Sequence, residues 1–523
     1  MYYCRLALTA LTVGVVLLTA CGAPESTRPQ GLPSGGERLA ESQVLKVRFY
    51  DDPSGFDPAT LFRIETENIA FNIYSGLTTY ESKTGRLIPD LAERWETTDQ
   101  RHWTFHLRKG VKWQKGYGEL SAGDVIYSYQ RILDPATGSP YRTQFANVDS
   151  IQAPDSSTVA IALKTPDANF LHQVANYHQG QVLKKEAVEK AGDQYKWNPA
   201  GTGPFAFESF TPGSEIVLTR HEGYFRGTPA LERIHFRIIK DDDTGAIALQ
   251  NGEVDFAMRI RSEEALKRLQ ADGRFDLNPS EIGNSTTIFN LQVKPLSDIR
   301  VRRAWAHALD YDAIVKAVGP LSYKKASGLL PQWMDVYTDD VPRYEYNPER
   351  ARQLLREAGY PNGFTVKHPA TAATGVTELQ QLEQSYLARV GINVEYELLD
   401  TPVFNQRRNR GDFDVAGRLF PAANPDTILF SYLHPDNMAP GGLNGARYNN
   451  PEVTSKLEAA RAEGDSARRK QLYAEVQRLA LTDLAYWPAT TNLHHWPSYK
   501  WVRGVALNPL TQVNYYEVSI LAH

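Results

Sequence analysis

Residues 103–113, Trp103-Thr104-Phe105-His106-Leu107-Arg108-Lys109-Gly110-Val111-Lys112-Trp113, are the stretch that decides the fold. Its first half places a large apolar side chain at every second position, which is the period of a strand with one buried face. Arg108, Lys109 and Gly110 then interrupt the alternation, as turn-forming positions do at the end of a strand. This stretch therefore predicts a half-buried β-strand followed by a tight turn.

The same alternation recurs along the chain, and helical patterns lie between the runs. Ser121 with Asp124 forms an acidic variant of the capping box ahead of an apolar stripe, and Pro135 closes that helix. A second helix is predicted to open at Asn347-Pro348 and to stop at Gly359. Interleaved strands and helices without internal repeats predict an α/β fold with mixed sheets covered by helices. The further strand-like runs are Leu45-Val47-Phe49, Val159-Ile161-Leu163, Ile234-Phe236-Ile238 and Ile392-Val394-Tyr396-Leu398.

The amino-terminal segment predicts secretion and a lipid anchor. A charge at Arg5 precedes an apolar run from Leu6 to Ala20, which is typical of a cleaved signal peptide and short for a transmembrane helix. Leu18-Thr19-Ala20-Cys21 resembles the lipobox of bacterial lipoproteins, so we expect residues 1–20 to be removed and Cys21 to carry acyl chains that hold the protein at the membrane. An ordinary signal peptide followed by an incidental cysteine is the alternative.

Composition also constrains the spacer, the disulfides, the domain number and the partners of the mature protein. Residues 21–43 are rich in Pro, Gly and Ser, which predicts a flexible spacer before a globular body that starts near Val44. Cys4 leaves with the signal peptide, so no disulfide is expected. About 500 mature residues exceed the size of one hydrophobic core, so two or three domains are expected. A net charge of −4 argues against a nucleic-acid partner.

Five segments carry a family resemblance: Ala92-Glu93-Arg94-Trp95 with Asp99 and residues 103–113, Ala122-Gly123-Asp124-Val125-Ile126-Tyr127-Ser128, Gly201-Thr202-Gly203-Pro204-Phe205, Asp298-Ile299-Arg300-Val301-Arg302-Arg303-Ala304 and Arg447-Tyr448-Asn449-Asn450-Pro451-Glu452-Val453. In this order and at these spacings they resemble the family 5 extracellular solute-binding proteins, the peptide and nickel binders of ABC importers. The resemblance covers nearly all of the mature chain. It implies a bilobal fold of the periplasmic-binding-protein type (type II) and a small-molecule or peptide receptor that delivers its ligand to permease subunits.

The resemblance also implies three domains. A discontinuous domain I would comprise residues 44–80, 198–288 and 493–523, with domain II (81–197) inserted in it. Domain III (289–492) would close over domain I like a jaw, and the ligand would stabilise the closed form that the transporter recognises. We expect the receptor to act as a monomer without a cofactor, outside the cytoplasm and on the periplasmic side in a Gram-negative cell.

In peptide-binding members of the family the ligand pairs its backbone with short strands from both jaws. The matching segments here are Phe62-Arg63-Ile64 and Gly417-Arg418-Leu419-Phe420. Many of these members follow the second segment with an aspartate that pairs the free ammonium of the peptide. Pro421 stands at that place, and a buried ammonium without a counter-charge is strongly unfavourable. Either another acid supplies the charge or the ligand lacks a free ammonium.

Arginine side chains near these segments suggest an anionic ligand. Arg418 occupies a position where the peptide-binding pattern often has tryptophan, and a guanidinium fork suits carboxylate or phosphate. Arg63, Arg408 and Arg447 lie in or near segments expected to face the cleft. Solvated surface arginines are the alternative. The aromatic residues Phe62, Phe420 and Tyr448 line a pocket or belong to the core, and the sequence leaves both interpretations open.

Metal and enzyme sites have weak support. His102 and His106 have a helical zinc spacing, but four residues of a strand span roughly 13 Å, so they cannot share one metal. His494 and His495 point to opposite faces if the chain is extended, and no catalytic motif is recognisable. The remaining alternatives are a receptor for a non-peptide solute, such as an oligosaccharide, an opine-like conjugate or a metal chelate, and an extracytoplasmic hydrolase.

Overall fold

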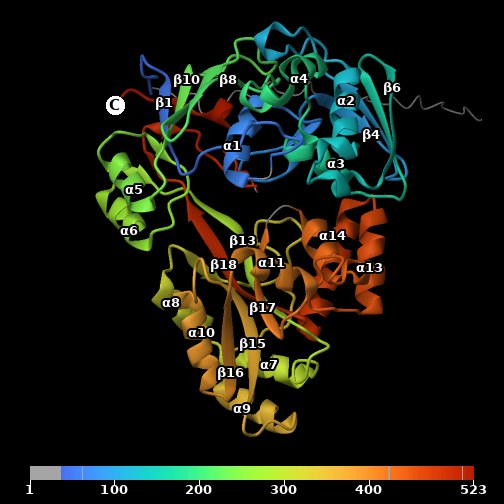
Figure 1. Cartoon of the computed structure of the whole chain (residues 1–523), viewed down its shortest axis with the longest axis vertical. Helices are drawn as coiled ribbons and strands as arrows, with labels where there is room; N and C mark the ends of the chain where they lie inside the picture. Colours follow the sequence, from blue (N-terminus) through green and yellow to red (C-terminus); the bar gives the residue numbers. More distant parts are fainter. Residues whose placement is uncertain (1–36, 62, 422–423, 509) are drawn as a thin grey trace, which may run out of the picture.

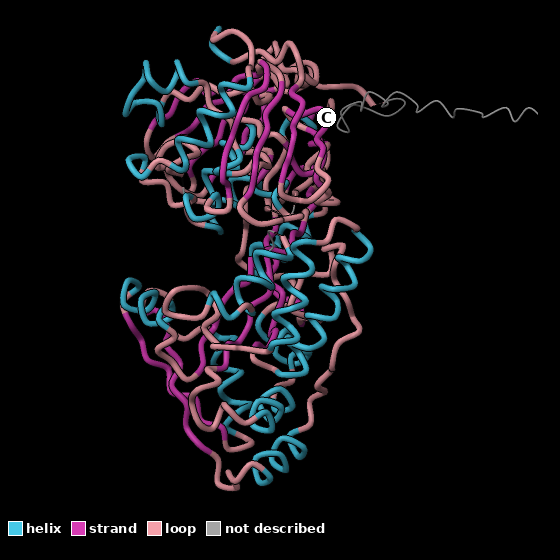
Figure 2. The backbone as a smooth tube through the Cα atoms, turned by 90° about the vertical axis from the view of Figure 1, so that its right-hand side faces the viewer, coloured by secondary structure: helices cyan, strands magenta, loops and turns pink. Residues whose placement is uncertain are grey.

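The computed structural model describes residues 37–61, 63–421, 424–508 and 510–523 and shows two lobes stacked along the long axis (Figure 1). The signal peptide and Cys21 lie outside the described residues. In the side view the lobes are joined at one side of the molecule (Figure 2). Within the described ranges, no helix has the length and apolar character needed to cross a bilayer.

A seven-stranded mixed sheet forms the centre of the upper lobe. Its strands come from three separated parts of the chain, in the order β12-β19-β11-β1-β10-β9-β8. Strand β1 runs parallel to β10 and β11, and its alternating Leu45, Val47 and Phe49 are fully buried in the core, as the sequence predicted. The elements are β1 (Val44–Phe49), β8 (Phe205–Thr211), β9 (Glu215–Arg220), β10 (Arg233–Ile238), β11 (Phe256–Ala257), β12 (Phe275–Asp276), β19 (Ser498–Tyr499), α1 (Ile64–Ile73), α4 (Lys185–Ala191), α5 (Asp242–Gln250) and α6 (Glu263–Asp272).

The strand predicted at residues 103–107 is β5, in a second sheet of the upper lobe. This four-stranded antiparallel sheet has the order β4-β5-β7-β6, and Trp103, Phe105 and Leu107 lie in its core. Helix α2 has the predicted capping box at Ser121 and Asp124. The elements of this part are β2 (Thr78–Tyr80), β3 (Leu87–Pro89), β4 (Ala92–Glu96), β5 (His102–Leu107), β6 (Val148–Asp155), β7 (Thr158–Leu163), α2 (Ala122–Leu133) and α3 (Phe170–Gln173).

The lower lobe is built on a four-stranded sheet in the order β14-β18-β13-β17, beside a parallel pair, β15 and β16. Strand β17 is an edge strand of the four-stranded sheet. The strands are β13 (Pro279–Phe289), β14 (Tyr323–Lys325), β15 (Phe364–Thr371), β16 (Ile392–Leu399), β17 (Val415–Pro421) and β18 (Tyr486–His495). The helices are α7 (Ile299–Ala308), α8 (Tyr311–Val318), α9 (Pro348–Glu357), α10 (Glu378–Ala388), α11 (Thr401–Arg410), α12 (Pro425–Leu433), α13 (Pro451–Ala462) and α14 (Ser466–Asp483).

The long antiparallel strands β13 and β18 run from the upper lobe into the lower one (Figure 1). A second link joins residues 168–169 of the upper lobe to α13 and α14. The amide of Ala168 donates to the carbonyl of Arg461 at 2.7 Å, and Asn169 Nδ2 donates to Tyr473 Oη at 3.1 Å. The boundaries after residues 288 and 492, which the resemblance implied, fall inside β13 and β18 because these strands belong to both lobes.

The end of the predicted spacer requires a correction. Residues 37–43 pack on the carboxyl-terminal segment, close to β21 (Ser519–Ile520), which pairs with β20 (Val502–Arg503). The amide of Ala40 donates to the Ile520 carbonyl at 2.9 Å, and the buried Gln43 exchanges two further hydrogen bonds with Ile520. The body therefore begins before Val44, because these contacts depend on a partner almost 500 residues away along the chain.

Candidate ligand-binding cavity

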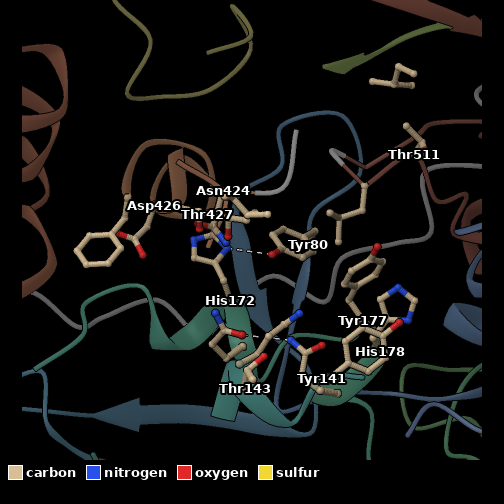
Figure 3. A pocket seen from close by; sticks show the side chains of 18 of the residues that line it. Tyr80, Tyr141, Thr143, His172, Tyr177, His178, Asn424, Asp426, Thr427 and Thr511 are labelled. Atoms are coloured by element: carbon tan, nitrogen blue, oxygen red, sulfur yellow. Dashed lines mark hydrogen bonds between the residues drawn. The ribbon is translucent and has the colours of Figure 1, made fainter. Parts of the chain in front are cut away.

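A cavity of about 900 Å³ is lined by residues of both lobes. Its size lies within the range of sites for small organic ligands, roughly 300–1,000 Å³. Figure 3 shows side chains of the upper lobe, such as Tyr80 and Tyr177, together with Asn424 and Asp426 of the lower lobe. A ligand in this cavity would contact both lobes at once.

One side of the cavity is an aromatic wall, which we define as Tyr80, Tyr141, His172, Tyr177 and His178. The rings of Tyr141 and His178 stack with centroids 4.6 Å apart, and the Tyr177 ring meets His178 edge-on at 4.0 Å. Tyr80 Oη lies 2.9 Å from His172 Nδ1. These contacts fix the ring orientations before a ligand arrives.

Burial keeps most of this wall uncharged. It lowers the pKa of His172 to about 4, so the imidazole is neutral at pH 7. It raises the pKa of Tyr80 and Tyr177 well above the ordinary value, so both phenols keep their protons. His178 has a positive φ of 42° and places its Nδ1 3.2 Å from Oε2 of the fully buried Glu67.

Four charged side chains of the cavity lining form two ion pairs, and Asp167 is a further acid there. Arg259 lies 3.5 Å from Glu65, and its guanidinium carbon is 3.5 Å from the centroid of the Tyr50 ring. Arg461 donates to Asp426 at 3.2 Å. Burial raises the pKa of Asp426 to about 7, although Arg461 opposes this shift. The lining therefore offers a ligand no arginine that is free of an acidic partner.

The lower-lobe side of the cavity is set by β17 and the start of α12. Leu419 of β17 is 38 % exposed and lines the cavity. Asn424 caps α12, because its Oδ1 accepts from the amide of Thr427 at 2.8 Å, and both residues line the cavity. The backbone of residues 417–421 pairs with β13 on one side only.

Of the predicted upper-lobe residues, Arg63 is described and lies outside the cavity lining. Phe62 lies outside the described residues, and Ile64 begins α1. Arg63 precedes that helix and forms ion pairs with Asp51 and Glu65. Glu65 also pairs with Arg259, so a chain of ion pairs connects Arg63 to the cavity lining.

The predicted lower-lobe arginines form a separate cluster. The Arg418 guanidinium carbon lies 5.3 Å from the centroid of the Tyr432 ring. Burial, and then the charge of Arg418, lowers the pKa of Arg408, whose buried Nε has no hydrogen-bond partner among the described residues. Arg418 and Gly417 are not in the cavity lining in this conformation. They lie next to Leu419, which is.

Phe420 and Tyr448 are core residues, which is the alternative that the sequence left open. Phe420 is 2 % exposed and stacks on Tyr432 with ring centroids 4.1 Å apart. Tyr448 is equally buried, and its hydroxyl donates to Asp483 at 2.6 Å. Arg447 donates to Gln292 and to the Arg410 carbonyl, away from the cavity lining. Phe420 and Tyr448 therefore belong to the core of the lower lobe and not to the cavity wall.

The histidines that the sequence singled out are separated as expected. His102 lies against Asp99 and His106 against Glu96, at different points of β5. His494 lines the cavity, and burial together with Arg259 and Arg261 lowers its pKa to about 3. His495 lies 2.6 Å from the carbonyl of Leu321.

Sequence reasoning missed the aromatic wall and the two ion pairs of the cavity. The wall residues follow no common strand or helix period, since Tyr141 lies in a turn, Tyr177 in a bend and His178 at the start of a short 3-10 helix. A polar and aromatic run at residues 176–181, whose members are mostly buried, was the signal available in the sequence. Buried polar side chains gathered in turns are typical of binding sites more than of a core.

Known proteins resemble the chain along almost its whole length. The family model of the bacterial extracellular solute-binding proteins, family 5, matches residues 86–439. The dipeptide-binding protein of Escherichia coli is 30% identical and the heme-binding protein A of Haemophilus influenzae 29% identical, over 94% and 98% of this chain and 97% and 98% of theirs. The solved structure of MoaA from A. tumefaciens R10 in complex with mannopinic acid is 27% identical, with a TM-score of 0.74 over 92% of this chain and 99% of that one.

These matches confirm the resemblance and the bilobal α/β fold of periplasmic binding proteins, since the aligned part includes both lobes. The chain belongs to the bacterial extracellular solute-binding proteins, family 5.

Proposed function

We propose that this chain is the substrate-binding lipoprotein of a bacterial ABC importer. It captures a peptide or peptide-like solute, modified and anionic forms included, and delivers it to the membrane permease. The observation that carries the proposal is the cavity lined from both lobes. A ligand that contacts both lobes stabilises the closed form by its differential affinity, and the permease then distinguishes the loaded receptor from the empty one.

The relatives favour a peptide ligand, whereas one residue, Pro421, disfavours a peptide with a free ammonium. The E. coli relative is named a dipeptide-binding protein, which favours a peptide. Pro421 ends β17 where peptide binders carry the aspartate for the ammonium, which disfavours a plain peptide. A non-peptide solute, such as an oligosaccharide, an opine-like conjugate or a metal chelate, is the second candidate, and MoaA with its mannopinic acid illustrates the conjugate class.

The proposed contacts follow from the strands at the cavity. The free edge of β17, residues 417–420, would pair with an extended ligand backbone when the lobes close, and the segment at Arg63 would pair from the other lobe. Arg418 and Arg408 would then attract a ligand carboxylate or phosphate, because their charges lie together and neither forms an ion pair with an acid among the described residues. We assign no catalytic role to any of these residues.

The location is proposed from the amino-terminal sequence. Cys21 would carry the lipid that tethers the body to the cell membrane, on the periplasmic side in a Gram-negative cell, and the body would act as a monomer. Growth with labelled palmitate tests the anchor: the wild-type protein should take up label and fractionate with membranes. A Cys21→Ser variant that is still labelled and still membrane-bound would contradict it.

Native mass spectrometry of the purified mature protein tests the function. We expect a bound small solute, and small-angle X-ray scattering should show a more compact particle with that solute than without it. An unmodified tripeptide should bind more weakly than micromolar; a tighter affinity would contradict the role of Pro421. Turnover of peptides or glycosides would instead favour an extracytoplasmic hydrolase.

A further inference from the structure

The cavity combines aromatic faces, neutral hydrogen-bonding groups and internally paired charges. Arg259 pairs with Glu65 and Arg461 with Asp426, and burial raises the pKa of the remaining acid of the lining, Asp167, which favours its neutral form. Around the aromatic wall the lining consists largely of uncharged amides, hydroxyls and imidazoles. For a ligand group that packs against this wall, a charge therefore adds little affinity, whereas hydrogen bonds and contact with the rings add much.

One buried acceptor in this part of the cavity has no partner. Gln179 lines the cavity and is 4 % exposed. Its Nε2 donates to Gln173 Oε1 at 3.2 Å, but its Oε1 is buried without a hydrogen-bond partner among the described residues. A buried carbonyl without a donor is costly, so a ligand that brings a donor gains that free energy on binding.

The other polar atoms of the wall have few hydrogen-bonding positions left for a ligand. His172 uses Nδ1 for Tyr80, so its other ring nitrogen is the one left for a ligand. The hydroxyl of Tyr141 is occupied, since it donates to the Leu61 carbonyl. Figure 3 shows the rings of Tyr80 and Tyr177 in this wall, with His172 bonded to Tyr80 on the side away from Tyr177.

We propose that the aromatic wall, with Gln179, is a subsite for an uncharged, hydroxyl-bearing ring, a sugar moiety of the ligand. The C–H face of such a ring packs on the tyrosine rings, and its hydroxyls donate to Gln179 and pair with His172. An aliphatic or phenylalanine side chain would cover the same rings but, because it carries no donor, would leave the Gln179 carbonyl unpaired. The inference rests on the proposed function and narrows its ligand to a sugar or to a sugar conjugate of an amino acid.

Calorimetric titration of the mature protein tests the subsite with four probes: asparagine that carries a glucose ring on its side-chain amide, maltose, Ala-Ala-Ala and Ala-Tyr-Ala. We expect at least one of the two sugar-bearing probes to bind at least tenfold more tightly than either peptide. Tyr177→Ala should weaken that probe at least tenfold, and Tyr346→Ala, an exposed tyrosine outside the cavity, should leave it unchanged.

A second variant removes only the acceptor. Gln179→Met keeps a similar volume and should weaken the sugar probe at least fivefold without lowering the thermal unfolding temperature, whereas Gln332→Met on the surface should do neither. Binding of Ala-Tyr-Ala that depends on Tyr177, or no binding of either sugar probe, overturns the inference. Either result leaves the importer role intact if native mass spectrometry finds a bound solute of another class, and that role fails only if none is found.

Discussion

Glu383 is a half-buried acid of the lower lobe whose ionisation should make stability depend on pH. It lies on α10 and accepts a hydrogen bond from Tyr311 Oη at 2.6 Å. Burial raises its pKa from 4.5 to about 7, although the bond from Tyr311 opposes the shift. The folded state therefore holds this proton more tightly than the unfolded state.

The sign and size of the effect follow from linkage. The stabilisation from the raised pKa is fully present below pH 4.5 and is lost as the pH rises through about 7. At ~1.4 kcal/mol for each pKa unit, the whole shift is worth ~3 kcal/mol in the free energy of unfolding. A Glu383→Gln variant keeps the shape and cannot ionise, so it should lose this dependence.

Urea unfolding, followed by tryptophan fluorescence, measures the difference between wild type and Glu383→Gln at pH 5 and pH 8.5. Trp487, whose ring centroid is 6.4 Å from that of Tyr311, reports on this part of the lobe. The variant should gain ~3 kcal/mol relative to wild type between the two pH values. Glu378→Gln, at an exposed position of the same helix, serves as the control. An equal difference at both pH values would refute the reasoning.

Three further substitutions test other contacts. Arg48→Met should destabilise the upper lobe by about 3–5 kcal/mol in thermal unfolding, because the buried guanidinium satisfies four carbonyls and a carboxylate; a loss under 1 kcal/mol would contradict this. Arg418→Ala should weaken an anionic ligand more than tenfold, about 1.4 kcal/mol, and the exposed Arg410→Ala should not; equal effects would return Arg418 to a surface role. Tyr448→Phe should cost about 1–3 kcal/mol of stability through the lost bond to Asp483 and leave ligand affinity unchanged, whereas a lower affinity would place Tyr448 at the site.

The sequence by itself determined the strands, the helices and the family. Alternation at residues 103–107 and the cap at Ser121 are local patterns, and a strand or helix start depends mainly on neighbours along the chain. The family motifs are likewise contiguous segments. For the same reason the sequence placed Phe420 in the right strand but could not decide whether its side chain faced the ligand or the core.

Only the tertiary structure decided which side chains meet at the cavity. Tyr80 and His172 are 92 positions apart in the sequence and lie within hydrogen-bonding distance. The pairing of Arg259 with Glu65 joins segments whose approach depends on the packing of the upper-lobe sheet and its helices. The composition of residues 37–43 predicts a spacer, because the sequence does not show that these residues pack against Ile520 at the far end of the chain. Such long-range contacts produce no periodic pattern in the sequence. Composition and spacing therefore predict the fold but not which side chains form the site.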